Sequence, residues 1–182
     1  MQTEIIISGF GGQGVLFAGQ LLSYAAMDHG LEVTWIPSYG PEMRGGTANC
    51  TVIISTEEIG APIVAHPTAV MAFNRPSLDK FEDVVKPGGV LVVNSSMVDR
   101  VPSRSGIKII RLPASEIAEQ IGDKRLTNMV MLGALLSNLS VLPIEALERA
   151  ISEHSPARHA RFIPLNLRAI REGAAFQKEN MN

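Results

Sequence analysis

Residues 4–28 have the sequence EIIISGFGGQGVLFAGQLLSYAAMD, and this stretch decides the fold class. Residues 4–8 form a short apolar run of the kind that is buried as a parallel strand. A glycine-rich turn follows at residues 9–14, and residues 15–28 have the apolar faces of a helix, which His29-Gly30 ends. Because a second strand-like run begins at Glu32, the stretch predicts two parallel, neighbouring strands joined by a helix.

The rest of the chain continues this alternation of strands and helices. Strand-like runs lie near residues 47–55, 70–73, 90–94 and 107–112, and the C-terminal third has helical patterns. Its 182 residues suit one domain. We therefore expect an α/β, Rossmann-like fold over residues 1–182: a single domain whose mainly parallel sheet has helices on both faces.

Composition excludes several function classes. The net charge of −2 gives no basis for nucleic-acid or membrane-surface binding. No apolar run approaches the roughly 18 residues that span a bilayer, and no signal peptide is recognisable, so we expect a cytoplasmic protein. The single Cys50 cannot supply the roughly four thiolates of an iron–sulfur cluster. The four histidines are scattered without zinc-site spacing, so we expect no metal site.

The turn at residues 9–14 is the first candidate site. Gly9, Gly11 and Gly14 match G-x-G-x-x-G between a strand and a helix, where the helix N-terminus offers unpaired N–H groups to an anion. The acid that a dinucleotide site needs after the second strand is missing. Two interpretations stay open: the glycines only let the helix pack on the sheet, or the turn faces a phosphate.

The loop at residues 37–46, PSYGPEMRGG, is the second candidate. It leaves the carboxyl end of a strand, where ligands of open α/β sheets bind. Arg44 is a permanent cation suited to phosphate or carboxylate, Gly45 and Gly46 let the backbone approach an anion, and Tyr39 offers a flat face. The alternative is a structured surface loop in which Arg44 pairs with Glu42.

A third feature is the apolar segment from Thr127 to Leu139. A helix that is apolar all round is buried, and we expect Thr127 to cap it. Asn128 in its first turn either caps the helix or reaches a ligand.

These three motifs together resemble the gamma subunits of 2-oxoacid:ferredoxin oxidoreductases. They are residues 9–14 (GFGGQG), 38–50 (SYGPEMRGGTANC) and 128–133 (NMVMLG), in the same order and spacing. The YGPEMRGG form is most similar to gamma subunits of the 2-oxoglutarate enzymes.

The resemblance implies an activity and a set of partners. The family converts a 2-oxoacid, coenzyme A and oxidised ferredoxin to acyl-CoA, carbon dioxide and reduced ferredoxin. Thiamine diphosphate, magnesium and iron–sulfur clusters are expected in alpha, beta and ferredoxin-like delta subunits, whereas this chain lies on the coenzyme A side. The residues expected to bind this co-substrate are Gly11, Gly12, Gln13, Gly14, Tyr39, Arg44, Gly45, Gly46 and Asn128.

Two other functions compete with this one. The chain could be a free-standing, Rossmann-type nucleotide-binding oxidoreductase, which the missing acid after the second strand disfavours. It could also be a purely structural subunit, in which case Tyr39 and Arg44 are replaceable without kinetic loss. In the leading interpretation the isolated chain is inactive.

Overall fold

The computed structural model describes residues 1–40 and 46–179, with side chains up to Phe176. The strands are β1 (Gln2–Phe10), β2 (Glu32–Tyr39), β3 (Thr47–Ser55), β4 (Ala69–Ala72), β5 (Val90–Asn94) and β6 (Lys108–Leu112). The helices are α1 (Val15–Asp28), α2 (Arg75–Phe81), α3 (Ala114–Ile121), α4 (Thr127–Leu136), α5 (Ile144–His154) and α6 (Ile163–Glu179), with short 3₁₀ segments η1 (Lys124–Leu126) and η2 (Ala157–Phe162). Within the described ranges, no helix combines the length and apolar character needed to cross a membrane.

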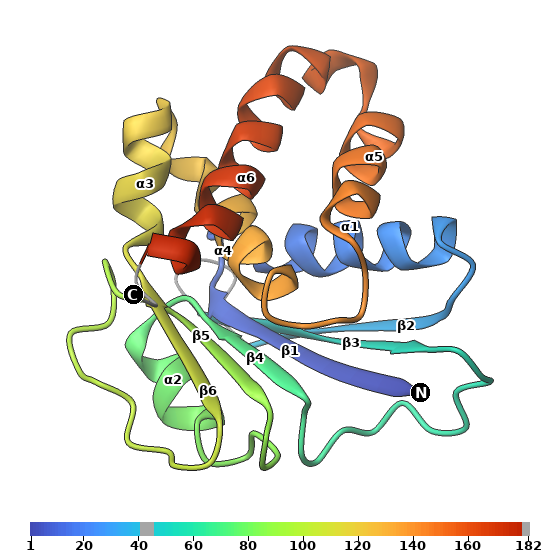
Figure 1. Cartoon of the computed structure of the whole chain (residues 1–182), viewed down its shortest axis with the longest axis vertical. Coiled ribbons are helices and arrows are strands. Elements are labelled where there is room, and N and C mark those ends of the chain that lie inside the picture. The colour runs from blue at the N-terminus through green and yellow to red at the C-terminus, as the bar shows by residue number, and fades with distance from the viewer. Residues whose placement is uncertain (41–45, 180–182) are drawn as a thin grey trace.

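One sheet organises the chain, with the strand order β2-β3-β1-β4-β5-β6 (Figure 1). The pairs β1–β4, β4–β5 and β5–β6 are parallel, whereas β3 is antiparallel to both β1 and β2. Five strands therefore run in one direction, and the expectation of a mainly parallel sheet is confirmed.

The expectation that the first two strands are neighbours in the sheet is wrong. β1 and β2 run in the same direction, but β3 lies between them. The reason is that β2 pairs with the strand that follows it in sequence, with Tyr39 opposite Ala48. Antiparallel strands need only a short connection, so β2 pairs with β3, and the other edge of β3 pairs with β1.

Helices cover both faces of the sheet, as expected. In Figure 1, α1, α4, α5 and α6 lie on one face and α2 on the other. Side chains of β1 alternate between the two faces: Ile5 and Ile7 pack in the larger core with α1 and α4, and Ile6 packs in the smaller core with Leu78 of α2. All strand carboxyl ends except that of β3 consequently meet at one edge, the carboxyl edge.

The helix α4 is buried along all ten of its residues, as its apolar sequence predicts. It crosses α6 in backbone contact: a Cβ on Gly133 would collide with the carbonyl group of Ile170, and one on Gly173 with that of Val130. Two details differ from expectation. The helix ends at Leu136, and Thr127 does not cap it, because its hydroxyl donates instead to the Lys124 carbonyl, 2.7 Å away.

Candidate anion-binding site at the carboxyl edge

Polar side chains are buried where three neighbouring strands end. Ser8 near the end of β1, Asn74 just after β4 and Asn94 at the end of β5 are each at most 3% exposed. All three are hydrogen-bonded: Ser8 to Ser77, Asn74 to the same serine's backbone N–H, and Asn94 to Ser115. These internally bonded side chains lie at the edge where open α/β sheets bind their ligands.

The glycine turn connects β1 to α1 through two left-handed residues. Gly12 has φ +95° and Gly14 has φ +74°, a region that other residues rarely adopt. The Gly11 N–H donates to the Gly46 carbonyl at 3.0 Å, so this turn is tied to the start of β3. Gly14 precedes α1 without a side-chain cap, and the first turn of α1 carries no acidic residue. The positive end of α1 therefore faces this edge without a compensating carboxylate in that turn.

Gln13 fastens the turn to the neighbouring strand. Its Oε1 accepts from the Phe10 N–H at 2.6 Å and from Asn74 Nδ2 at 3.2 Å. Asn74 in turn caps α2. We had not predicted Asn74 as a site residue, although its sequence gives a signal: an Asn after a buried strand, followed by Arg75-Pro76, is typical of a helix start.

Asn128 lies at the glycine turn, and its polar atoms are used within the chain. Its Nδ2 donates to the Gly14 carbonyl at 3.2 Å, and its Oδ1 accepts from the Met129 N–H at 2.9 Å. It is only 5% exposed. It therefore holds the start of α4 against the start of α1, which differs from both capping α4 and pointing freely at a ligand.

The second candidate segment is partly a strand. Pro37, Ser38 and Tyr39 extend β2 instead of belonging to a loop. Tyr39 ends the strand with 71% of its surface exposed. Arg44 and Gly45 lie outside the described residues, whereas Gly46 is placed beside Gly11 by their hydrogen bond.

Three hollows surround the glycine turn. The aromatic hollow, of about 270 Å³, has the turn glycines on its rim and Phe17, Tyr39 and Ala48 among its walls. The basic hollow, of about 320 Å³, is lined by Gly12, Gln13, Met97, Ser115, Lys124, Arg125 and Thr127. The helix hollow, of about 220 Å³, lies between Phe17, Arg125, Asn128 and Phe162.

Lys124 and Arg125 are site residues that the sequence interpretation missed. Both lie in η1, and both are already paired: Lys124 with Glu119 at 3.4 Å and Arg125 with Asp123 at 2.6 Å. Hydrogen bonds from Arg125 lower the pKa of Asp123, so this carboxylate stays ionised and offsets the arginine. Because both cations are paired, the charge around the basic hollow is locally balanced.

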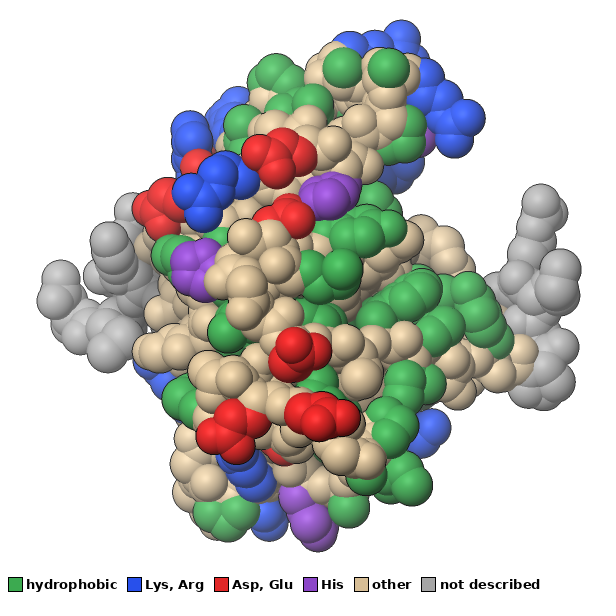
Figure 2. Space-filling view, turned by 90° about the vertical axis from the view of Figure 1, so that its right-hand side faces the viewer, with side chains coloured by type: hydrophobic (Ala, Val, Ile, Leu, Met, Phe, Trp, Pro, Cys, Tyr) green, Lys and Arg blue, Asp and Glu red, His purple; other side chains and the backbone are tan. Residues whose placement is uncertain are grey.

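The opposite edge of the sheet has a different character. Figure 2 shows the face where the strands begin, with acidic side chains across its middle. Glu32 at the start of β2, and Glu57 and Glu58 after β3, are exposed there. Because carboxylates repel an anion, an anionic ligand is favoured at the carboxyl edge over this one.

The single cysteine lines none of the three hollows. Cys50 is fully buried in β3, and its thiol contacts the Val15 carbonyl at 3.7 Å. Burial raises the pKa of this thiol to about 11, so it is protonated at neutral pH. Cys50 is therefore a core residue.

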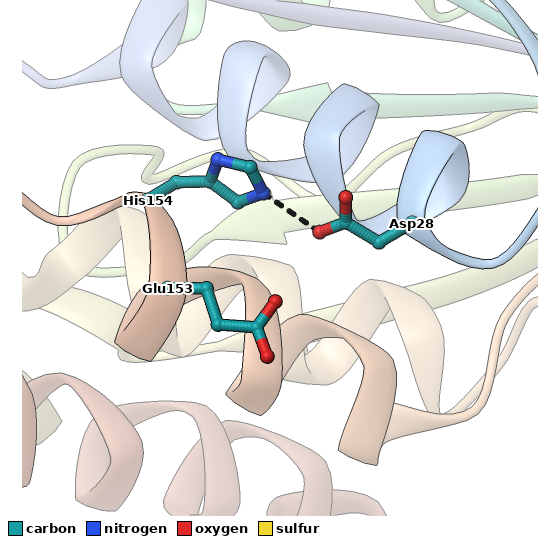
Figure 3. Close-up of side chains that lie close together, drawn as sticks. All are labelled: Asp28, Glu153 and His154. Carbon is teal, nitrogen blue, oxygen red and sulfur yellow. Dashed lines mark hydrogen bonds and ion pairs between the residues drawn. The ribbon is translucent and has the colours of Figure 1, made fainter.

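One group of potential ligand atoms lies outside the carboxyl edge (Figure 3). His154 Nε2 is 2.7 Å from Asp28 Oδ2, and Glu153 brings a carboxylate oxygen within 4.8 Å of both atoms. The sequence patterns do not predict that these three residues lie close together. All three are exposed, and the His154 ring stacks on Tyr24 at 4.3 Å. The contact joins the ends of α1 and α5, which accounts for the arrangement.

Residues 4–176 match the family model described as "Pyruvate ferredoxin/flavodoxin oxidoreductase". The chain is 40% identical over 181 residues to ketoisovalerate oxidoreductase subunit VorA of Methanothermobacter thermautotrophicus, covering 99% of this chain and 37% of that relative. It is 42% identical over 164 residues to 2-oxoglutarate synthase subunit KorC of Methanothermobacter marburgensis, covering 86% and 88%. The chain thus spans little more than a third of VorA but most of KorC.

Solved structures share the fold. A structure described as the gamma subunit of a keto/oxoacid ferredoxin oxidoreductase from Geobacter sulfurreducens superimposes with a TM-score of 0.81 at 32% identity, covering 94% of this chain and 96% of that one. The 2-oxoglutarate:ferredoxin oxidoreductase from Magnetococcus marinus, described with 2-oxoglutarate, coenzyme A and succinyl-CoA bound, gives a TM-score of 0.87 at 27% identity, covering 98% of this chain and 31% of that one. The chain therefore belongs to the pyruvate ferredoxin/flavodoxin oxidoreductase family, as its three motifs predicted.

Proposed function

We propose that this chain, as a gamma-type domain over residues 1–182, is the gamma subunit of a 2-oxoacid:ferredoxin oxidoreductase and lines the coenzyme A side of a composite active site. The observation that carries the proposal is the glycine turn. It presents the uncapped, positive end of α1 to the aromatic hollow, which Tyr39 also lines, at the carboxyl edge of the sheet. The likeness to KorC and to the Geobacter gamma subunit supports the subunit assignment.

The reaction is the oxidative decarboxylation of a 2-oxoacid to acyl-CoA, with the electrons passing to ferredoxin. Thiamine diphosphate, magnesium and iron–sulfur clusters belong to alpha, beta and delta subunits in this proposal. One cysteine cannot supply the roughly four thiolates of a cluster, so the proposal assigns no cluster to this chain. The substrate is 2-oxoglutarate in our proposal, on the strength of the YGPEMRGG motif; the likeness to VorA makes ketoisovalerate the alternative.

The residues at the carboxyl edge fit the parts of coenzyme A. Its phosphates suit the N-terminus of α1 and the backbone of Gly12 and Gly14. Its adenine suits the exposed ring of Tyr39. The titratable side chains that line the three hollows in the described chain are Tyr39, Asp123, Lys124, Arg125 and His159. Asp123 is paired with Arg125, and in our proposal this chain binds and orients the co-substrate.

A dinucleotide oxidoreductase fits the site less well. Holding the ribose of NAD or FAD requires an acid at the carboxyl end of β2. The strand ends there in Ser38 and the exposed Tyr39. Neither side chain can replace a carboxylate, whose two oxygens can accept hydrogen bonds from both ribose hydroxyls.

Arg44 gives the test of this function, from its place in the motif. In the assembled enzyme, Arg44→Ala should raise the Michaelis constant for coenzyme A roughly tenfold or more, because a charge-assisted hydrogen bond is worth about 1.5–3 kcal/mol. The constant for the 2-oxoacid should change little. Steady-state kinetics with each substrate varied separately measures both constants.

A matched variant controls for the loss of a positive charge. Lys108→Ala removes an exposed cation at the start of β6, on the opposite edge of the sheet, and should change neither constant. If Arg44→Ala alters only the constant for the 2-oxoacid, the loop serves the other substrate. If it alters neither, the chain is a structural subunit.

The partners and the location stay predictions. Alpha, beta and delta chains should co-purify with the native protein, and ferredoxin should serve as the electron acceptor. A cytoplasmic location is expected with them.

A further inference from the structure

An apolar loop lies at the edge of the sheet opposite the candidate site. Residues 56–68 connect the end of β3 to the start of β4 without regular structure, and Figure 1 shows them running past the beginning of β1. Residues 59–65, with the sequence IGAPIVA, carry no polar side chain. Five of these seven residues are exposed, and Ile59 and Val64 are half-buried. We refer to residues 59–65 as the apolar loop.

Packing within the chain does not account for the composition of this loop. Ile63 has 88% of its surface exposed, more than any other large apolar side chain in the described ranges. A Cβ on Gly60 would meet nothing within 4 Å, so the loop stands away from its neighbours there. An exposed run of roughly four or more apolar residues is uncommon unless it serves a function, because apolar surface in water is unfavourable. The apolar loop therefore indicates a surface that covers it.

The loop is fixed at both ends and open between them. At its start, the Thr56 N–H donates to the Met1 carbonyl at 3.1 Å. At its end, His66 Nδ1 lies 3.4 Å from the Val84 carbonyl oxygen. In the part of the chain that the structure describes, the backbone of residues 58–65 makes no hydrogen bond. The loop thus keeps its own donors and acceptors for a partner, and its anchored ends reduce the entropy that binding costs.

The lengths of two relatives indicate what covers the loop. This chain aligns over 99% of its length with VorA but covers only 37% of that relative, whereas it covers 88% of KorC. The same domain is therefore joined to a longer polypeptide in one relative and stands almost alone in the other. A domain that assembles without a covalent link must hold its partner by a surface, and the surfaces of permanent complexes are the more apolar ones.

Charges beside the loop specify the partner's surface further. Glu57 and Glu58 are exposed immediately before the apolar loop, and Glu32 is exposed on the same edge of the sheet. An apolar groove with cations along its rim would complement both features, since opposite charges across an interface steer association and fix its register. A nucleic acid or an anionic membrane would be repelled by the same carboxylates.

We propose that the apolar loop, with Ile63 as its central anchor, docks this chain into an apolar, cation-rimmed groove of a larger partner subunit. That subunit corresponds to the part of VorA that this chain does not cover. The inference rests on the proposed function for the existence of the complex, and it adds the surface by which this chain joins it. Because the loop lies away from the glycine turn, docking there leaves the carboxyl edge open to a ligand.

Titration of the partner subunits with this chain measures the docking, with reduction of ferredoxin by the 2-oxoacid as the readout. Ile63→Asp places a charge at the anchor and should raise the concentration for half-maximal activity roughly thirtyfold or more. Loss of an interface anchor costs about 2 kcal/mol or more, and about 1.4 kcal/mol corresponds to tenfold. At saturating concentrations of the variant, kcat and the Michaelis constant for coenzyme A should equal those of the wild type.

Two controls show that the effect belongs to the loop. Val101→Asp introduces the same charge at another loop residue that is apolar and 67% exposed, but that has Arg100 and Pro102 as neighbours. It should leave the half-maximal concentration unchanged. Ile63→Leu keeps an apolar anchor and should retain most of the affinity. The isolated Ile63→Asp chain should keep the wild-type midpoint of urea unfolding, because an exposed substitution has little effect on stability.

A photo-crosslinker at the same position identifies the occupant. In the purified, assembled enzyme, Ile63→p-benzoylphenylalanine should crosslink to the larger subunit, in peptides similar to the part of VorA outside the match. Crosslinks between two copies of this chain, together with a dimer that Ile63→Asp dissociates, would show that the loop binds a second copy instead.

The remaining outcomes separate the docking surface from the proposed function. If the Ile63→Asp chain assembles as tightly as the wild type, the docking surface is wrong, and an effect of Arg44→Ala on the constant for coenzyme A would still uphold the proposed function. If the wild-type chain neither assembles with partner subunits nor restores their activity, both proposals fail.

Discussion

At the scale of single residues, the glycine turn is defined by what its glycines allow. Gly12 and Gly14 both have positive φ, but their surroundings differ. A Cβ on Gly14 would collide with the Asn128 amide, whereas a Cβ on Gly12 meets open space. Gly14 is thus needed both for its positive φ and for the close approach of α4 to α1. Gly12 is needed for its positive φ alone.

This difference predicts unequal costs of two alanine substitutions. Gly12→Ala should lower the free energy of unfolding by about 1–2 kcal/mol, the cost of a left-handed non-glycine residue. Gly14→Ala should cost about 2–4 kcal/mol, because displacing Asn128 is added to that backbone cost. Urea unfolding of both variants measures the two values, and equal losses would show that Asn128 moves away freely.

At the scale of elements, α4 and α6 depend on their glycines for contact. Val130 and Gly133 on α4 face Ile170 and Gly173 on α6 so closely that the backbones touch. Carbonyl groups, unlike the ends of flexible side chains, cannot swing aside to admit a methyl group. The crossing must therefore open if either glycine gains a side chain.

We expect Gly173→Ala to lower the free energy of unfolding by about 3 kcal/mol or more, since overpacking costs about 1–3 kcal/mol even where neighbours adjust. Gly60→Ala is the matched control, because a Cβ there meets nothing within 4 Å. Its effect should lie within about 0.5 kcal/mol of zero. Thermal or urea unfolding that ranks the two variants equally would contradict the backbone contact.

The end of α2 is held by a buried carboxylate. Glu82 is 4% exposed and accepts hydrogen bonds from Arg100 and from the backbone N–H groups of Ser103 and Arg104. Burial opposes its ionisation, but these hydrogen bonds outweigh burial, and the pKa lies below its ordinary value of 4.5. Glu82 thereby fixes the connection from β5 to β6 against α2.

A lowered pKa makes this contribution depend on pH. The ionised Glu82 stabilises the fold fully above its ordinary pKa of 4.5, and the stabilisation is lost as the pH falls through the lower folded pKa. At pH 7, Glu82→Gln should cost about 2–3 kcal/mol, and the gap to the wild type should close in acid. Glu57→Gln, at an exposed site, should show no gap at either pH; a constant gap for Glu82→Gln would contradict the assignment.

At the scale of the whole molecule, much of the fold follows from local sequence patterns. The alternation of apolar runs, glycine turns and amphipathic segments predicts the α/β class, the helix from Val15 to Asp28 and the buried helix from Thr127. The order of strands in the sheet does not follow, because no local pattern states that β3 inserts between β1 and β2. That insertion depends on pairings between residues 37 (Phe10 and Thr47) to 53 (Gln2 and Ser55) positions apart.

The candidate site was predictable to the same extent. Its glycines and Asn128 occupy recognisable positions in sequence motifs, and the structure brings them together through the Gly14 carbonyl. Phe17, Lys124 and Arg125 belong to no motif, and only the docking of α1, η1 and α4 at one edge makes them neighbours of the turn. Local sequence patterns do not identify a side chain whose role depends on how distant elements pack together.

The central claim is that coenzyme A binds at the N-terminus of α1, and amide hydrogen exchange of the assembled enzyme tests it most directly. The N–H groups of a helix's first turn have no partners within the helix, so residues 15–17 at the start of α1 should exchange readily in the free enzyme. Saturating coenzyme A should slow exchange in residues 15–17, and the 2-oxoacid alone should not. Unchanged exchange there at saturating coenzyme A, in an enzyme that turns over, would contradict the claim.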